Sequence, residues 1–342
     1  MLENFETQFE RVVGGTEGER ARLKHELQEE LLQIGDQDIA KYEIRLTEQD
    51  KTIIQNAEEF AYRMAKFYGG DPKPIPPHKI HFVRSGGASE LTNGEFYGGI
   101  HRSLAQEIVV DRDLESNVDV ATTLVHEMFH QLSYKAAQID AQKKHRMYRS
   151  GIIVSDRESR IKHFSDIEEA IAEILAKKFY DEEMQNNPLY SEEIEATNKL
   201  KESLLHIVHR FNPTQEQNER EAMEEVYSIP SAREILTIFE KIEPDKETIA
   251  TIVAEFPPKT KGRDVFVGRK NERDKLWRLI DEIIEKSHGR FENRQEVFDI
   301  FARANFSGNL IPLARLIESI FGKGSFRRLG EETADTGGTE NK

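Results

Sequence analysis

The chain has 342 residues, of which 48 are basic and 63 acidic, so its formal net charge is −15. This length allows two or three domains of about 100–200 residues each. The acidic balance argues against a nucleic-acid-binding protein, because neutralising phosphates requires clustered lysine and arginine in excess. The chain contains no cysteine, which excludes disulfide frameworks, thiolate metal sites and cysteine nucleophiles. Any bound metal ion would therefore be held by histidine and carboxylate side chains.

The sequence indicates neither a secretory signal nor a membrane span. Its start, MLENFETQFERVV, carries acidic residues where a signal peptide would carry basic ones. No apolar stretch approaches the roughly 20 residues that a transmembrane helix needs. We therefore expect a cytoplasmic protein without a membrane partner.

The N-terminal segment, residues 1–77, has the pattern of a helical layer. Helical periodicity runs over Gly18–Leu32 and Glu48–Tyr68, and Gly69-Gly70 follows as a stop signal. Four prolines lie between Asp71 and Pro77. They exclude a helix there, because proline lacks the backbone donor and forces extended conformations on the residue before it. This proline-rich stretch therefore marks the boundary between the N-terminal and central segments.

The central segment, residues 78–190, begins with strand-like runs separated by glycine, serine and asparagine, which predicts a small sheet. The expected strands are Lys79–Val83, Glu95–His101 and Gln106–Asp111, followed later by Met147–Val154 and Arg160–Phe164. We interpret Ile108 and Val110 as core residues. Gly98-Gly99 is a place where another backbone could approach closely.

Two helices in this segment carry the informative residues. The first is expected over Asn117–Lys135, with Ser116 and Asp119 in position for a capping box, and the second over Asp166–Met184. Residues 191–329 are predicted to form a helical C-terminal domain punctuated by prolines. Residues 330–342 are polar and glycine-containing, which predicts a disordered tail.

The first helix contains the pattern His126-Glu127-x-x-His130. A spacing of four places both imidazoles on one helical face, one turn apart, where two nitrogens can reach the same cation. Glu127 is angularly offset from the histidines, so it can reach a metal-bound water, which is the position of a general base. By contrast, His25 and Glu29 share this spacing in a helix charged on nearly every side, and we interpret them as a solvated face.

Two histidines require a third ligand, because catalytic zinc normally takes three protein ligands and leaves the fourth position for water. On the second helix, Glu169 and Glu173 lie one turn apart, and Asp166 shares their side. The opposite side is apolar. The residues alone leave several candidates for the third ligand, which are Glu169, Glu168, Glu173, Asp166 and His163.

The pairing of His126-Glu-x-x-His130 with Glu169-Ala-x-x-Glu173 resembles the gluzincin metallopeptidases, the thermolysin-like clan. The resemblance covers residues 79–185 and implies an α+β zincin-like core. It implies that Zn²⁺ is held by His126, His130 and Glu169, and that Glu173 accepts a proton from the non-metal nitrogen of a ligand histidine.

Two features depart from the family pattern. Glu168 stands where family members often have asparagine, and the separation between His130 and Glu169 is longer than in thermolysin, which leaves room for an inserted hairpin.

Thermolysin-like enzymes also use a tyrosine or histidine donor to stabilise the oxyanion of the tetrahedral intermediate. None of the candidate donors matches a family motif residue by residue. They are Tyr148 and His163, with Tyr134, His206 and His209 as further candidates.

These observations predict a zinc-dependent hydrolase, in particular a peptidase acting on peptide or protein substrates. Glu127 would take a proton from water as it attacks and pass it to the leaving amine. The alternative is a non-catalytic interaction protein that retains a structural metal site in a zincin core. Nucleotide binding is discounted, because Phe266-Val-Gly-Arg269 is not accompanied by a Gly-x-x-x-x-Gly-Lys phosphate loop.

Overall fold

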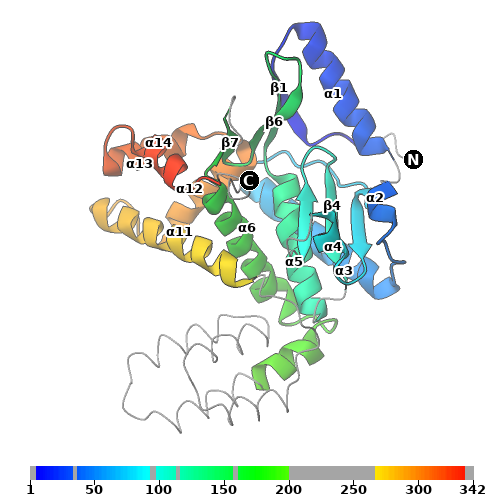
Figure 1. Cartoon of the computed structure of the whole chain (residues 1–342). Helices are drawn as coiled ribbons and strands as arrows, with labels where there is room; N and C mark the ends of the chain where they lie inside the picture. The colour runs from blue at the N-terminus through cyan, green and yellow to red at the C-terminus, as the bar shows by residue number, and fades with distance from the viewer. Residues whose placement is uncertain are drawn as a thin grey trace, which may run out of the picture.

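The computed structural model describes residues 5–33, 37–92, 98–112, 116–156, 161–199 and 266–335. These residues form an α+β structure of helices with two small sheets, one of five strands and one of three (Figure 1). The α+β class predicted from the sequence is therefore confirmed.

The first sheet contains β2 (Ile80–Val83), β3 (Gly99–Arg102) and β4 (Glu107–Asp111) in the order β2-β4-β3. Strand β4 pairs in parallel with β2 and antiparallel with β3. Every residue of β2 and β4 is buried, and the core positions predicted for Ile108 and Val110 are confirmed. Strand β3 forms one edge of this sheet and overlaps the predicted strand Glu95–His101, of which residues 95–97 lie outside the described residues.

The second sheet has the order β1-β5-β6-β7-β8. Its strands are β1 (Phe9–Gly14), β5 (Lys135–Ile139), β6 (His145–Ser150), β7 (Ile153–Ser155) and β8 (Lys162–His163). Strands β5 to β8 are successive antiparallel neighbours, so the longer separation between His130 and Glu169 accommodates hairpins, as predicted.

Two strands of this sheet were not predicted. Strand β1 lies in the segment expected to be helical and pairs in parallel with β5, far along the chain. Strand β5 includes Lys135, which was assigned to the preceding helix. That helix ends at Leu132 because Ser133 adopts an extended conformation.

The helices are positioned largely by local capping. The predicted helices are found as α1 (Glu17–Leu32), α3 (Glu48–Phe67), α5 (Asn117–Leu132) and α6 (Ser165–Phe179), which continues as a π-helical turn over Tyr180–Met184. The short elements are α2 (Gln37–Ala40), a 3₁₀ turn over Pro77–Lys79 and α4 (Gly87–Leu91). Thr16, Thr47 and Ser116 each accept a backbone hydrogen bond at a helix start, which confirms the predicted cap of α5.

The described part of the C-terminal region contains α11 (Phe266–Lys286), α12 (Arg294–Ser307), α13 (Ile311–Phe321) and α14 (Ser325–Glu332), and residues 191–199 are also helical. Helix α11 packs on α6. Phe129 of α5 lies 6.2 Å from Phe60 of α3 and 6.0 Å from Phe306 of α12, measured between ring centroids. Helices from all three predicted segments therefore share one cluster of buried residues.

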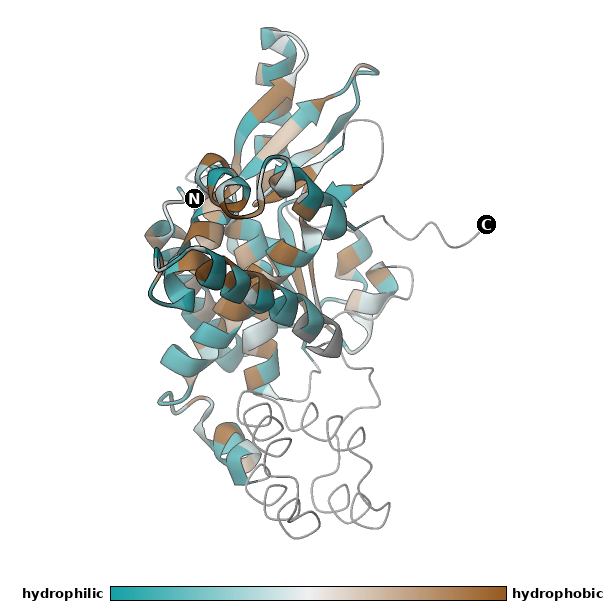
Figure 2. Cartoon of the chain, turned by 90° about the vertical axis from the view of Figure 1, so that its left-hand side faces the viewer, coloured by the Kyte–Doolittle hydropathy of each residue, from teal (hydrophilic) through white to brown (hydrophobic). Residues whose placement is uncertain are grey.

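Helix surfaces alternate between hydrophobic and hydrophilic residues, as Figure 2 shows. No helix within the described ranges is long and apolar enough to cross a membrane. The segment expected to be a disordered tail, residues 330–342, begins inside α14. Main-chain groups of Gly330, Thr333 and Asp335 form hydrogen bonds with those of Phe164, Asp166 and Lys162, respectively, and residues 336–342 lie outside the described ranges.

The start of α6 has an unusual backbone. Phe164, which precedes the helix, has φ 68°, a left-handed conformation that is strained for a bulky residue. Its backbone nitrogen donates to the carbonyl of Gly330, and its ring packs at 4.8 Å on that of Phe326. Any Cβ at Gly330 would lie 2.7 Å from the Phe164 ring. Helix α14 thus holds the turn from which α6 departs.

A buried carboxylate ties α3 to the start of α5. Asp50 accepts hydrogen bonds from the backbone nitrogen of Thr47 at 2.8 Å and from Nε of Arg112 at 2.5 Å. Arg112 also donates to Asn117, the first residue of α5, at 2.9 Å. Burial raises the pKa of Asp50, but the hydrogen bonds from Thr47 and Arg112 outweigh it and hold the pKa below its usual range.

We expect Asp50→Asn to lower the free energy of unfolding at pH 7 by about 1–3 kcal/mol, because hydrogen bonds to a buried charge are lost. Since the folded-state pKa of Asp50 is lowered, its contribution is present above the unfolded-state pKa and lost as the pH falls. The gap between variant and wild type should therefore narrow below about pH 4. Urea denaturation at several pH values measures this, with the exposed Glu48→Gln as control. A gap that does not change with pH would contradict the assignment.

Candidate metal centre

Helix α5 carries its polar residues inside the protein. Every residue from Val118 to Leu132 is buried, including His126, Glu127 and His130. Strand β3 covers the face that bears Glu127, and a Cβ at Gly99 would lie 2.7 Å from Thr123 Cγ2 and 2.9 Å from Glu127 Cγ. Glycine at this position thus allows side chains of α5 to approach the strand, whereas the sequence suggested approach by another backbone.

Two helices bring three donor atoms together. Nε2 of His126 lies 2.9 Å from Nε2 of His130 and 3.3 Å from Oε2 of Glu169, and His130 Nε2 lies 3.6 Å from that oxygen. Ligands at zinc-like bond lengths around a tetrahedral ion are about 3.3–3.4 Å apart. The group formed by His126, His130 and Glu169 could therefore hold a metal ion, whose identity the donor atoms alone do not fix.

The outer nitrogens of both imidazoles face carboxylates. Nδ1 of His130 lies 2.8 Å from Oε1 of Glu168, whose side chain is 2% exposed. Nδ1 of His126 is buried and has no hydrogen-bond partner among the described residues, and the nearest Glu173 oxygen is 3.6 Å away. The sequence assigned the supporting role to Glu173 alone. In the structure Glu168, which stands where gluzincins often have asparagine, makes the closer contact.

Proton binding and metal binding compete at this group. Burial lowers the pKa of His130, but the carboxylates of Glu168 and Glu169 outweigh it and raise the pKa well above its usual range. Burial raises the pKa of Glu169, but the two imidazoles hold it well below the usual value. Because a ligand imidazole must be neutral, metal binding would release a proton from His130.

A buried lysine fixes the end of α5 behind the metal group. Nζ of Lys135 donates to the carbonyl oxygens of His130 at 2.9 Å and Gln131 at 2.7 Å. Burial lowers the pKa of Lys135 to about 7. Gln131 Oε1 also lies 2.7 Å from Nε2 of His101, whose ring is nearly parallel to that of His130. Neither Lys135 nor His101 belongs to a sequence pattern that could have identified it.

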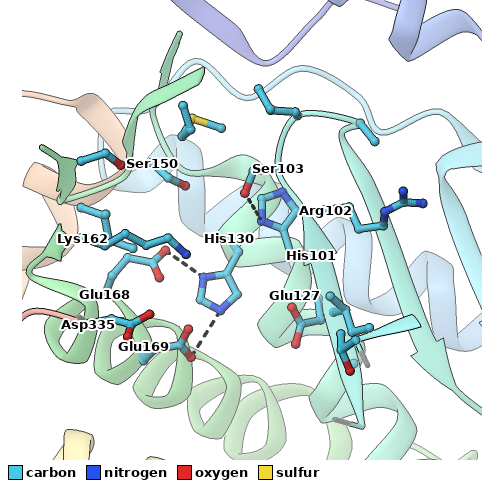
Figure 3. A pocket seen from close by; sticks show the side chains of 18 residues that line it. His101, Arg102, Ser103, Glu127, His130, Ser150, Lys162, Glu168, Glu169 and Asp335 are labelled. Carbon is cyan, nitrogen blue, oxygen red and sulfur yellow. Dashed lines mark hydrogen bonds and ion pairs between the residues drawn. The ribbon is translucent and has the colours of Figure 1, made fainter. Parts of the chain in front are cut away.

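A cavity of about 710 Å³ opens beside the metal group (Figure 3). One wall is β3 and the turn after it, and the other is formed by β6, β7 and β8. Glu127, His130, Glu168 and Glu169 lie between these walls. The remaining lining residues include His101, Arg102, Ser103, Leu104, Met147, Ser150, Ile153, Ser155, Lys162 and Asp335.

The oxyanion donors predicted from the sequence that the structure describes do not line this cavity. Tyr148 and His163 are not among the residues that line this cavity. Tyr134 packs under the guanidinium of Arg149, 4.8 Å from its ring centroid, and against Gly308. The other two candidates, His206 and His209, are outside the described residues. The cavity instead presents Lys162, one position before His163.

Comparison with protein-family models, curated proteins and solved structures finds no match to this chain. The assignment of a metal-binding group therefore depends on the geometry of His126, His130 and Glu169 in this chain itself.

We expect His126→Ala and Glu169→Ala to lose most of the metal that the wild type retains, because each removes one of three donors to a common point. Mass spectrometry of protein purified without added metal, and again after reconstitution and desalting, measures this. The control is His25→Ala, which removes an exposed imidazole that also has a glutamate four residues later. Equal metal content in all four proteins would refute the site.

Removal of Glu168 should weaken metal binding without abolishing it. We expect Glu168→Ala to lower metal affinity about 10–100-fold, because His130 loses the carboxylate that orients it. Glu168→Gln should lie between Ala and wild type, since its amide oxygen can still accept from the imidazole. Competition with a chromophoric chelator gives the affinities, and the exposed Glu182→Gln is the control. An unchanged affinity in Glu168→Ala would show that this contact does not support the ligand.

Proposed function

We propose that this chain is a zinc-dependent hydrolase, and specifically a metallopeptidase of the gluzincin type. The observation that carries the proposal is that Glu127 lines the same cavity as His130 and Glu169. A group of three donors beside an open cavity leaves room for water and substrate, as catalytic zinc sites do. The side chain of Glu127 is nearly completely buried, so it reaches the cavity from a fixed position.

The donor atoms, taken together with Glu127, favour zinc. Two imidazoles and one carboxylate suit Zn²⁺, although non-haem iron oxygenases use the same combination. The glutamate between the two histidines distinguishes the two classes, because a hydrolase needs a general base beside the metal and an oxygenase does not. The resemblance of residues 79–185 to gluzincins supports the same assignment.

When bound, zinc would lower the pKa of a coordinated water and polarise the scissile carbonyl. Glu127 accepts the proton of the attacking water at a carboxylate oxygen and then donates it to the leaving amine. Glu168 holds the His130 ring in orientation through Nδ1. Residues of β3 line the cavity, and because β3 is an edge strand within the described part of its sheet, it would offer main-chain groups to an extended peptide.

We expect Glu127→Gln to retain its metal and to lose peptide hydrolysis by at least about 100-fold, because the amide cannot accept the proton. Cleavage of a peptide library by the zinc-loaded proteins, followed by mass spectrometry, measures activity, and metal analysis is run on the same samples. Glu59→Gln, at an exposed position of α3, is the matched control. A zinc-loaded wild type that cleaves no peptide would favour a non-catalytic protein with a structural metal site.

A further inference from the structure

One wall of the cavity is a regular β surface. Ser155 of β7 is paired with Lys162 of β8, and Ile153 of β7 with Ser150 of β6. Directly opposed residues lie on the same face of a sheet, as do residues two apart on one strand. The side chains of these four residues therefore share one face, and all four line the cavity beside the metal group.

Lys162 brings a positive charge to this face. Figure 3 shows its side chain extending into the cavity on the side of Glu168 and His130. Within the part of the chain that the structure describes, its ammonium group makes no ion pair or hydrogen bond. Arg102, the other cation lining the cavity, differs because its guanidinium donates to Glu107 at 3.0 Å.

The two glutamates nearest to Lys162 along the metal group already contact the imidazoles. Glu168 binds Nδ1 of His130, and Glu169 faces the two imidazoles. Asp335 is joined to Lys162 by two main-chain hydrogen bonds of 3.0 Å. The ammonium of Lys162 can therefore meet a negative charge that a ligand brings. Met147 and Ile153 line the same cavity and can contact the aliphatic part of such a ligand.

We propose that Lys162 is a specificity-determining residue that binds a carboxylate of the substrate, so that the peptidase prefers peptides with an anionic group beside the cleaved bond. This inference depends on the proposed function. The carboxylate has two sources in a peptide, an aspartate or glutamate side chain and the C-terminal carboxylate. A lysine ammonium is a compact point charge that accommodates either source.

The test compares wild type, Lys162→Met and Lys162→Glu as zinc-loaded full-length proteins. Each digests a proteome-derived peptide library, once with free C-termini and once with amidated C-termini, and mass spectrometry identifies the cleaved bonds. Enrichment of aspartate and glutamate in both libraries indicates side-chain recognition. Enrichment of bonds near the C-terminus only in the free-acid library indicates recognition of the terminal carboxylate.

We expect Lys162→Met to lower kcat/KM for the preferred peptides about tenfold, mainly through KM, because the lost contact is with a group that does not react. Neutral peptides should be unaffected, and Lys162→Glu should favour basic residues instead. Lys51→Met, which removes an exposed lysine of α3, is the matched control. Cleavage with the same preference in wild type and both variants would overturn the inference and leave the proposed function intact.

If hydrolysis is not seen, a binding measurement tests the carboxylate site at Lys162 separately from the proposed peptidase function. Fluorescent alanine pentapeptides carrying a central glutamate or glutamine, each with a free or amidated C-terminus, are titrated into zinc-loaded Glu127→Gln and into the double variant with Lys162→Met. Tighter binding of the anionic peptides that is lost in the double variant supports the carboxylate site, even where absent hydrolysis refutes the peptidase. Equal binding of all four peptides overturns the inference.

Discussion

The structure depends on holding two nitrogens and one oxygen, from helices far apart in sequence, within 3.6 Å of one another inside the protein. Uncompensated polar atoms in an interior are costly, so hydrogen bonds to the surrounding groups stabilise this arrangement. Glu168 satisfies His130 from the second helix, and Lys135 satisfies the carbonyls at the end of the first. The packing of α5 on α6 is therefore both the core of the fold and the construction of the site.

The described C-terminal helices take part in this construction. Asn305 of α12 accepts a hydrogen bond from the backbone nitrogen of Ile152 at 2.9 Å, and its carbonyl accepts one from Tyr134 at 3.1 Å. These contacts join α12 to the two ends of the β5–β6 hairpin, because Tyr134 precedes β5 and Ile152 follows β6. Helix α14 supports the left-handed Phe164 before α6. The described C-terminal helices thus support both the strands of the cavity wall and the start of the helix that supplies Glu169.

Features that depend on neighbouring residues were predictable, and features that depend on distant pairings were not. The cap at Ser116 and the periodicity of α5 and α6 are local, and the spacing of His126 and His130 follows from helix geometry alone. Strand β1 is stabilised by β5, a partner far along the chain that no local pattern reveals. Glu168 was noted as a departure from a family pattern, but its contact with His130 requires the relative placement of two helices. Lys162 belongs to no local pattern, and its place on the cavity wall follows from the pairing of β7 with β8.

The charges around the cavity connect the metal group with Lys162. Four carboxylates line the cavity, Glu127, Glu168, Glu169 and Asp335, whereas Arg102 and Lys162 are its lining cations. With neutral imidazoles these groups leave a formal charge of −2, which a divalent cation would cancel. An acidic peptide approaching this chain, which carries a net charge of −15, would otherwise be repelled. A bound divalent ion would offset that repulsion at the cavity, and under our proposal the ammonium of Lys162 would then hold the substrate carboxylate.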